Sequence, residues 1–137
     1  MNGSTRRSIA RALPGTVYAL WLLAGAAIFV LPRHFHELTP GVALFGPFNA
    51  HFIRDVGLVY LASGLVGLYG VRVGSMALCI AAALWSSLHA VFHLHVWAAR
   101  GWPLDGIFLF DLSFVIVPPF LVVLTLLTCR DEKEMSP

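Results

Sequence analysis

The sequence predicts an all-α protein, a bundle of four transmembrane helices that forms a single integral membrane domain over residues 1–137. Its composition is 58% hydrophobic and 12% charged, whereas a soluble domain is about half apolar and about a quarter charged. The apolar residues also form long runs, and about 20 of them cross the ~30 Å hydrocarbon core of a bilayer. Four such runs leave little chain for a soluble domain, and the net charge of +2 gives no reason to expect a nucleic-acid partner.

The four expected helices follow one another with short connections, except after the first. That first run comes after several arginines, as in a signal peptide, but it continues beyond the small residues "LAGAA", so we expect a retained helix. The turn "YGVRVGS" separates the second run from the third. In the fourth run, Pro118 and Pro119 should remove backbone hydrogen bonds and kink the helix. The expected helices cover residues 16–31, 50–71, 73–97 and 107–129.

The distribution of lysine and arginine predicts the orientation. Cytoplasmic loops of membrane proteins carry an excess of these residues, and a cytoplasmic N-terminus gives the larger number to the inner side. We therefore expect an N-in/C-in topology, with a bacterial inner (cytoplasmic) membrane as the location. The inner residues would be Arg6, Arg7, Arg11, Arg72, Arg130 and Lys133, and the outer ones Arg33, Arg54 and Arg100.

A long outer loop is expected between helices one and two. It contains Pro32, Pro40 and Pro47 and a short apolar piece, "VALF". A segment of this kind can lie in the membrane interface or cap a bundle as a lid.

Polar residues converge on the outer half of the expected bundle. All six histidines fall there, although they are spread through the sequence. Two pairs, His51 with Asp55 and His89 with His93, are four residues apart, so each pair shares one helix face. Asp111 enters the same level from helix four. His95 is about 200° around the helix from His93 and should point elsewhere.

Histidine and carboxylate pairs on facing helices are the groups from which bundles build metal sites, and imidazole suits zinc, copper and iron. The leading prediction is therefore a transition-metal site open to the outer side, with redox or hydrolytic chemistry as its associated reactions and Arg54 beside it. Whether a reaction is catalysed stays open. In an enzyme, Asp55 or Asp111 would serve as ligand or general base. The predicted metal ligands are His51, Asp55, His89, His93 and Asp111.

Several alternatives remain open at this stage. The charged groups and histidines can form an interfacial network that only stabilises the fold. A haem can be held between His51 and His93. A quinone or lipid can bind under the loop, with histidine and aspartate exchanging protons. The protein can also be a small structural subunit of a larger membrane complex or a homo-oligomer, because helix two is rich in glycine. The roles of His34, His36 and His95 stay open.

The stretch "NAHFIRDVGLVYLASGLVGLYG" resembles a segment of small bacterial four-helix membrane proteins of the DoxX-like kind. The resemblance covers the second helix and extends to the rest of the chain only as topology. It implies a compact four-helix bundle and no particular activity. The matching residues are Asn49, His51, Arg54, Asp55, Gly57, Tyr60 and Gly64.

Overall fold

A computed structural model describes the backbone of residues 3–134 and the side chains of residues 11–128. Within this part of the chain the structure is all-α, with no strand, which confirms the predicted class. The elements are α1 (Gly3–Val30), α2 (Pro32–Leu38), the 3₁₀ helix η1 (Val42–Phe45), α3 (Ala50–Val73), α4 (Met76–Ala99), α5 (Gly106–Phe110), the π-helix η2 (Asp111–Ile116) and α6 (Val117–Glu134).

Of the described helices, four are long and apolar enough to cross a membrane, as the sequence predicts. Their boundaries differ from the expected ones. The first helix begins well before residue 16, and Pro14 lies inside it. Val73 belongs to the second span and not to the third, because Gly74 adopts a left-handed conformation that ends α3. The candidate spans are Arg11–Val30, Ala50–Val73, Met76–Ala99 and Gly106–Thr128.

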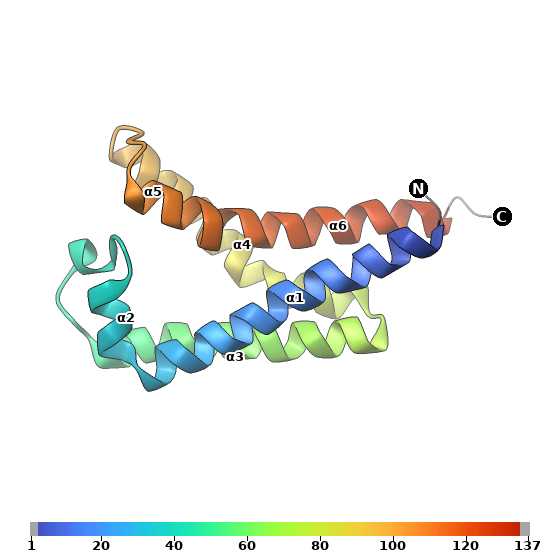
Figure 1. The fold of residues 1–137 in the computed structure, drawn as a ribbon, viewed down its shortest axis with the longest axis horizontal. Helices are drawn as coiled ribbons and strands as arrows, with labels where there is room; N and C mark the ends of the chain where they lie inside the picture. Colours follow the sequence, from blue (N-terminus) through green and yellow to red (C-terminus); the bar gives the residue numbers. More distant parts are fainter. Residues whose placement is uncertain (1–2, 135–137) are drawn as a thin grey trace.

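The four long helices form a ring in which α1 contacts α3, α3 contacts α4, α4 contacts α6, and α6 contacts α1. Figure 1 shows that the beginning of α1 and the end of α6 lie at the same end of the bundle. From there α1 runs diagonally, so it diverges from α6 and lies along α3 at the end where α2 and α5 lie (Figure 1). The N-in/C-in topology, that is, the side of the membrane that each end faces, stays a prediction. Four of the residues on which it depends have side chains outside the described part of the chain: Arg6, Arg7, Arg130 and Lys133.

Glycines determine how closely α1 packs against α3. A Cβ atom added to Gly57 would lie 2.9 Å from the backbone nitrogen of Phe29, and one added to Gly64 would lie 2.7 Å from that of Leu22. At Gly67 it would lie 2.3 Å from ring atoms of Tyr18. Small residues at helix contacts are typical of membrane bundles. Here they hold α1 on α3 and so turn one face of α3 inward.

The connection at residues 31–49, expected as a loop, is largely helical. Residues 32–45, which we call the strap, contain α2 and η1. Gly41, with a φ of 87°, precedes η1 and contacts the side chain of Ile107 on α5. His36 Nε2 lies 3.2 Å from the carbonyl oxygen of Gly46 and donates to it. The strap therefore spans one end of the bundle, from α1 towards α5.

The expected disturbance of the last helix by Pro118 and Pro119 takes the form of a π-helix just before them. A proline has no N–H, and its ring crowds the carbonyl four residues earlier. The Val117 N–H accordingly bonds the carbonyl of Leu112, five residues back. Single π turns inside helices are frequent at functional sites, and this one begins at the buried Asp111.

Candidate functional site

The end of α4 directs His89 and His93 towards the bundle interior. Their ring centroids are 4.6 Å apart with planes at 72°, so the predicted sharing of one helix face is confirmed. His89 also stacks on Trp85 one turn earlier, with centroids 4.7 Å apart. His95 is exposed and points away from the other two, as expected from its position.

The second half of this cluster comes from the π-helix. Asp111 Oδ2 lies 2.9 Å from His93 Nδ1, and the two side chains are only 11% and 18% exposed. The ring nitrogen lies close to the carboxylate, but it is not aligned for a hydrogen bond, and it has no other partner among the described residues. The contact therefore joins α4 to η2 through two largely buried polar side chains.

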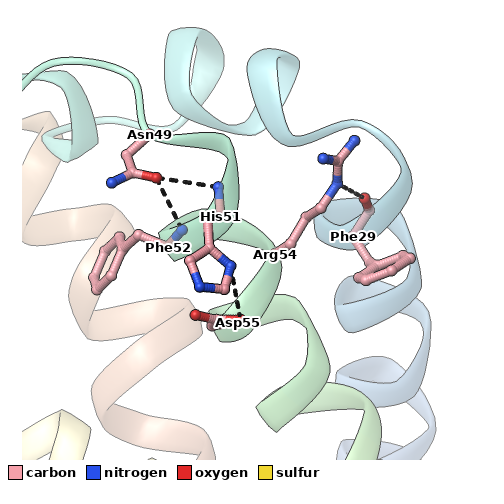
Figure 2. Close-up of polar contacts among 6 residues, drawn as sticks. All are labelled: Phe29, Asn49, His51, Phe52, Arg54 and Asp55. Atoms are coloured by element: carbon pink, nitrogen blue, oxygen red, sulfur yellow. Dashed lines mark hydrogen bonds and ion pairs between the residues drawn. The ribbon is translucent and has the colours of Figure 1, made fainter.

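The other predicted pair lies on the outside of the bundle. Asn49 caps α3 by accepting from the backbone N–H groups of His51 and Phe52, both at 3.1 Å. His51 Nδ1 then lies 3.6 Å from Asp55 Oδ1, one turn along the same helix. Figure 2 shows this pair beside the capped first turn of α3. The side chains of His51 and Asp55 are 89% and 53% exposed, so they face away from His93 and Asp111.

Arg54 joins α3 to the end of α1. Its Nε donates to the carbonyl oxygen of Phe29, 3.3 Å away (Figure 2). The last carbonyls of a helix lack partners within the helix, and a cation there also interacts favourably with the helix dipole. Arg54 therefore caps α1, and its expected place beside a metal stays a prediction.

The structure thus divides the five predicted metal ligands into two groups. His89, His93 and Asp111 are together inside the bundle, and His51 and Asp55 lie outside it. Among the described residues, no group of three or more His, Cys, Asp or Glu side chains is arranged to hold a metal ion. Metal binding therefore stays a prediction. The axial haem pair His51 and His93 likewise does not face a common space.

A large cavity opens beside the interior cluster. Its volume is about 640 Å³, within the range of about 300–1,000 Å³ that is usual for small-molecule sites. The long helices, the strap and the α5–η2 segment all contribute to its wall. The lining residues are Val17, Leu20, Trp21, Ala24, Ile28, Phe35, Thr39, Pro40, Gly41, Val42, Phe45, Phe52, Ile53, Val56, Tyr60, His89, Phe92, His93, Ile107, Phe110, Asp111, Ser113, Phe114, Val115 and Pro118.

The polar groups of this cavity are few. Thr39 and Ser113 supply hydroxyl groups, and the ionisable side chains come from α3, α4 and η2. His89, His93 and Asp111 are the ionisable side chains there besides Tyr60, and none of the described lining residues is lysine or arginine. Tyr60 lies in edge contact with Trp85, at 5.3 Å between ring centroids, and so adjoins His89. The wall therefore offers hydrogen-bond donors and acceptors without a permanent positive charge.

Sequence reasoning did not assign Tyr60 or Trp21 to a site. They belong to a row of aromatic contacts that runs from the core to His89, with Trp21 and Tyr60 at 6.2 Å between centroids. A signal was present in the sequence, because Phe52, Val56 and Tyr60 recur every four residues on α3. This spacing places them on one helix face, and that face lines the cavity.

Fold and site together define an all-α protein with four candidate membrane spans and an apolar internal cavity that carries a histidine–aspartate cluster. Comparison with family models, with curated proteins and with solved structures finds no match to this chain. The resemblance to DoxX-like proteins therefore stays a prediction.

Proposed function

We propose that the protein binds a membrane-soluble ligand with an uncharged, hydrogen-bonding head group, such as a quinone, in this cavity. The observation that carries the proposal is the His93–Asp111 contact, with its atoms 2.9 Å apart, on the wall of an otherwise apolar space of about 640 Å³. A mostly apolar pocket with a few convergent polar groups is the usual form of a small-molecule site.

The polar cluster suits a head group that contains oxygen. An imidazole both donates and accepts hydrogen bonds, and a carboxyl group accepts when ionised and donates when protonated. His93 and Asp111 can therefore form hydrogen bonds with either a carbonyl or a hydroxyl group, because one proton can move between the two side chains. His93 Nδ1 lacks an aligned partner, and an unpaired buried polar group is costly. Ligand binding that realigns this ring would lower that cost.

The absence of lysine and arginine from the described lining argues for an uncharged head group. A phosphate or carboxylate taken from water into an apolar space needs a compensating charge. Asp111 would repel such an anion. A cation would have to displace His93 from Asp111 in order to pair with the carboxylate. A neutral head group meets neither obstacle.

The proposal is tested with matched probes in proteoliposomes. Trp21 lies in the cavity wall, so a bound brominated ligand should quench its fluorescence. We expect saturable quenching by a brominated fatty alcohol and by an alkyl benzoquinone, which quenches without bromine. The brominated fatty sulfate of the same chain length should give only the linear quenching of a lipid that does not bind. Linear quenching by all three probes would contradict the proposal.

Transition-metal binding is the second candidate. His93 Nδ1 and Asp111 Oδ2 are two potential ligand atoms close together and largely buried, and His89 adjoins them. Elemental analysis of protein purified without a metal-binding tag, together with an absorption spectrum, tests it. About one zinc, copper or iron per chain that is lost in His93→Ala would favour a metal over an organic ligand. A Soret band would instead indicate haem.

A further inference from the structure

We infer that the ligand enters the cavity from within the bilayer, through a gap between α1 and the η2–α6 segment, and not from water. The gap is bordered by Leu20 and Phe114. The inference rests on the proposed function and adds to it a source for the ligand, namely molecules dissolved in the lipid.

Five large apolar residues both line the cavity and are at least half exposed: Leu20 on α1, Phe45 on the strap, Phe52 on α3, Phe92 on α4 and Phe114 on η2. Of these, Leu20 and Phe114 border the gap. Leu20 and Phe114 both line the cavity, yet they are 58% and 64% exposed. A residue that lines an internal space and is also largely exposed marks a place where that space reaches the surface. The two residues belong to α1 and η2, which lie on opposite sides of the divergence between α1 and α6 in Figure 1.

The gap lies at membrane depth. Leu20 is in the middle of the span Arg11–Val30, about 14 Å from either end at 1.5 Å per residue. Phe114 is eight residues into the span Gly106–Thr128, about 12 Å along its axis. A hydrocarbon core is ~30 Å thick, so both residues face lipid tails when these helices span the membrane.

The packing of α1 explains why the gap exists. Gly57 and Gly64 draw α1 against α3 so closely that a Cβ atom would collide with its backbone. In the half that precedes Leu20, α1 also packs against α6, where Tyr18 and Val122 share the buried core. Because α1 stays against α3 from Gly15 to Phe29, it leaves the η2 region of the last helix largely uncovered.

The strap covers the end of the cavity that lies nearest to α5, although its lining residue Phe45 is 62% exposed. Phe35, Val42 and Phe45 from the strap line the cavity. Gly41 approaches Ile107 so closely that a Cβ atom would lie 2.9 Å from its side chain. His36 holds the strap to the following chain through the carbonyl oxygen of Gly46. A ligand arriving from water would have to separate these contacts.

The test measures release of a quenching ligand. Protein loaded with an alkyl benzoquinone is mixed with excess empty vesicles, and recovery of tryptophan fluorescence is followed in a Trp97→Phe/Trp102→Phe background. We expect Leu20→Phe, which narrows the gap, to slow recovery about threefold or more and to slow the onset of quenching after ligand addition by a similar factor, because a gate alters rates in both directions. Leu23→Phe is the matched control, since Leu23 is equally exposed on α1 but does not line the cavity.

A second variant tests the alternative route. His36→Ala removes the bond to Gly46 and loosens the strap, and recovery should keep the rate of the parent protein. Faster recovery in His36→Ala, with no change in Leu20→Phe, would overturn the inference and assign the route to the strap, while the proposed function would stand. Absence of saturable quenching in the parent protein would overturn both.

Discussion

The two histidine–aspartate pairs of this protein have the same chemistry and different surroundings. His51 and Asp55 are neighbours on one helix, 3.6 Å apart, and are largely exposed. His93 and Asp111 come from different elements, are 2.9 Å apart, and are mostly buried. The first pair needs only the repeat of a helix, whereas the second needs α4 and η2 to be placed correctly by the whole fold.

The comparison shows that spacing alone does not identify a site. An exposed pair that reaches water gains little from the contact of its members. A buried pair in a membrane protein must compensate for the loss of water, and intramembrane ionisable groups are by default functional candidates. The cavity is lined by His93 and Asp111 and not by the exposed pair, and the proposed function rests on this difference.

The largest expected difference between the pairs is in their coupling energy. In a double-mutant cycle with alanine at both positions, His93 and Asp111 should show a coupling of about 2–4 kcal/mol, because removal of one partner leaves the other buried and unpaired. His51 and Asp55 should show at most about 0.5 kcal/mol. Unfolding in mixed micelles measures both cycles. Equal couplings would mean that burial does not distinguish the pairs.

Ligand affinity should separate the pairs in a second way. Asp111→Asn and His93→Leu should weaken saturable quenching by the alkyl benzoquinone about 10- to 100-fold, since a hydrogen bond to a charged group contributes about 1.5–3 kcal/mol. The matched variants Asp55→Asn and His51→Leu should keep the parent affinity. If all four variants behave alike, the head group does not bind at the cluster.

The membrane fold could be predicted from the sequence because the bilayer imposes a simple requirement. Long apolar runs identify the four spans, and the structure has helices at each of them. The ends were less predictable. The end of α3 depends on the left-handed Gly74 and on the capping hydroxyl of Ser75, which accepts from Leu78 N–H. The π-helix depends on how a pair of prolines is accommodated, and periodicity contains no sign of it.

The site was only partly predictable, for a physical reason. Spacing correctly placed His89 beside His93 and directed His95 elsewhere. It could not orient α3, because the four-residue spacing of His51 and Asp55 is the same on an inward and on an outward face of a helix. Glycine packing decides the orientation. Gly57 faces α1 and lies about 120° around the helix from His51, so His51 is directed away from both α1 and the cavity.

Chemical modification provides a third comparison of the two pairs. The quantity compared is the rate at which each histidine reacts. His51 is 89% exposed and His93 is 18% exposed, so diethyl pyrocarbonate should modify His51 much faster in detergent. Peptide mass spectrometry resolves the two sites. Addition of the alkyl benzoquinone should protect His93 further and leave His51 unchanged. Protection of His51 alone would place the ligand on the outer surface.

A third acid–base contact, between Arg100 and Asp105, extends the comparison of exposed and buried pairs. Its removal should change stability least of all the variants. Asp105 caps α5 by accepting from the Phe108 N–H at 2.9 Å and also pairs with Arg100. The Phe108 N–H, followed by Arg100, lowers the pKa of Asp105 below its ordinary value of 3.8.

Because the folded pKa of Asp105 is lowered, its contribution to stability is complete above about pH 5 and fades as the pH falls through 3.8 towards the lowered value. Asp105→Asn keeps a capping side chain but loses this pH dependence. Its melting temperature should therefore fall less than that of the parent protein on acidification from pH 5 to about pH 3. The Asp105 side chain is 38% exposed, so the difference should be small. An equal fall of the melting temperature in both proteins would mean that the contacts of Asp105 contribute no pH-dependent stability.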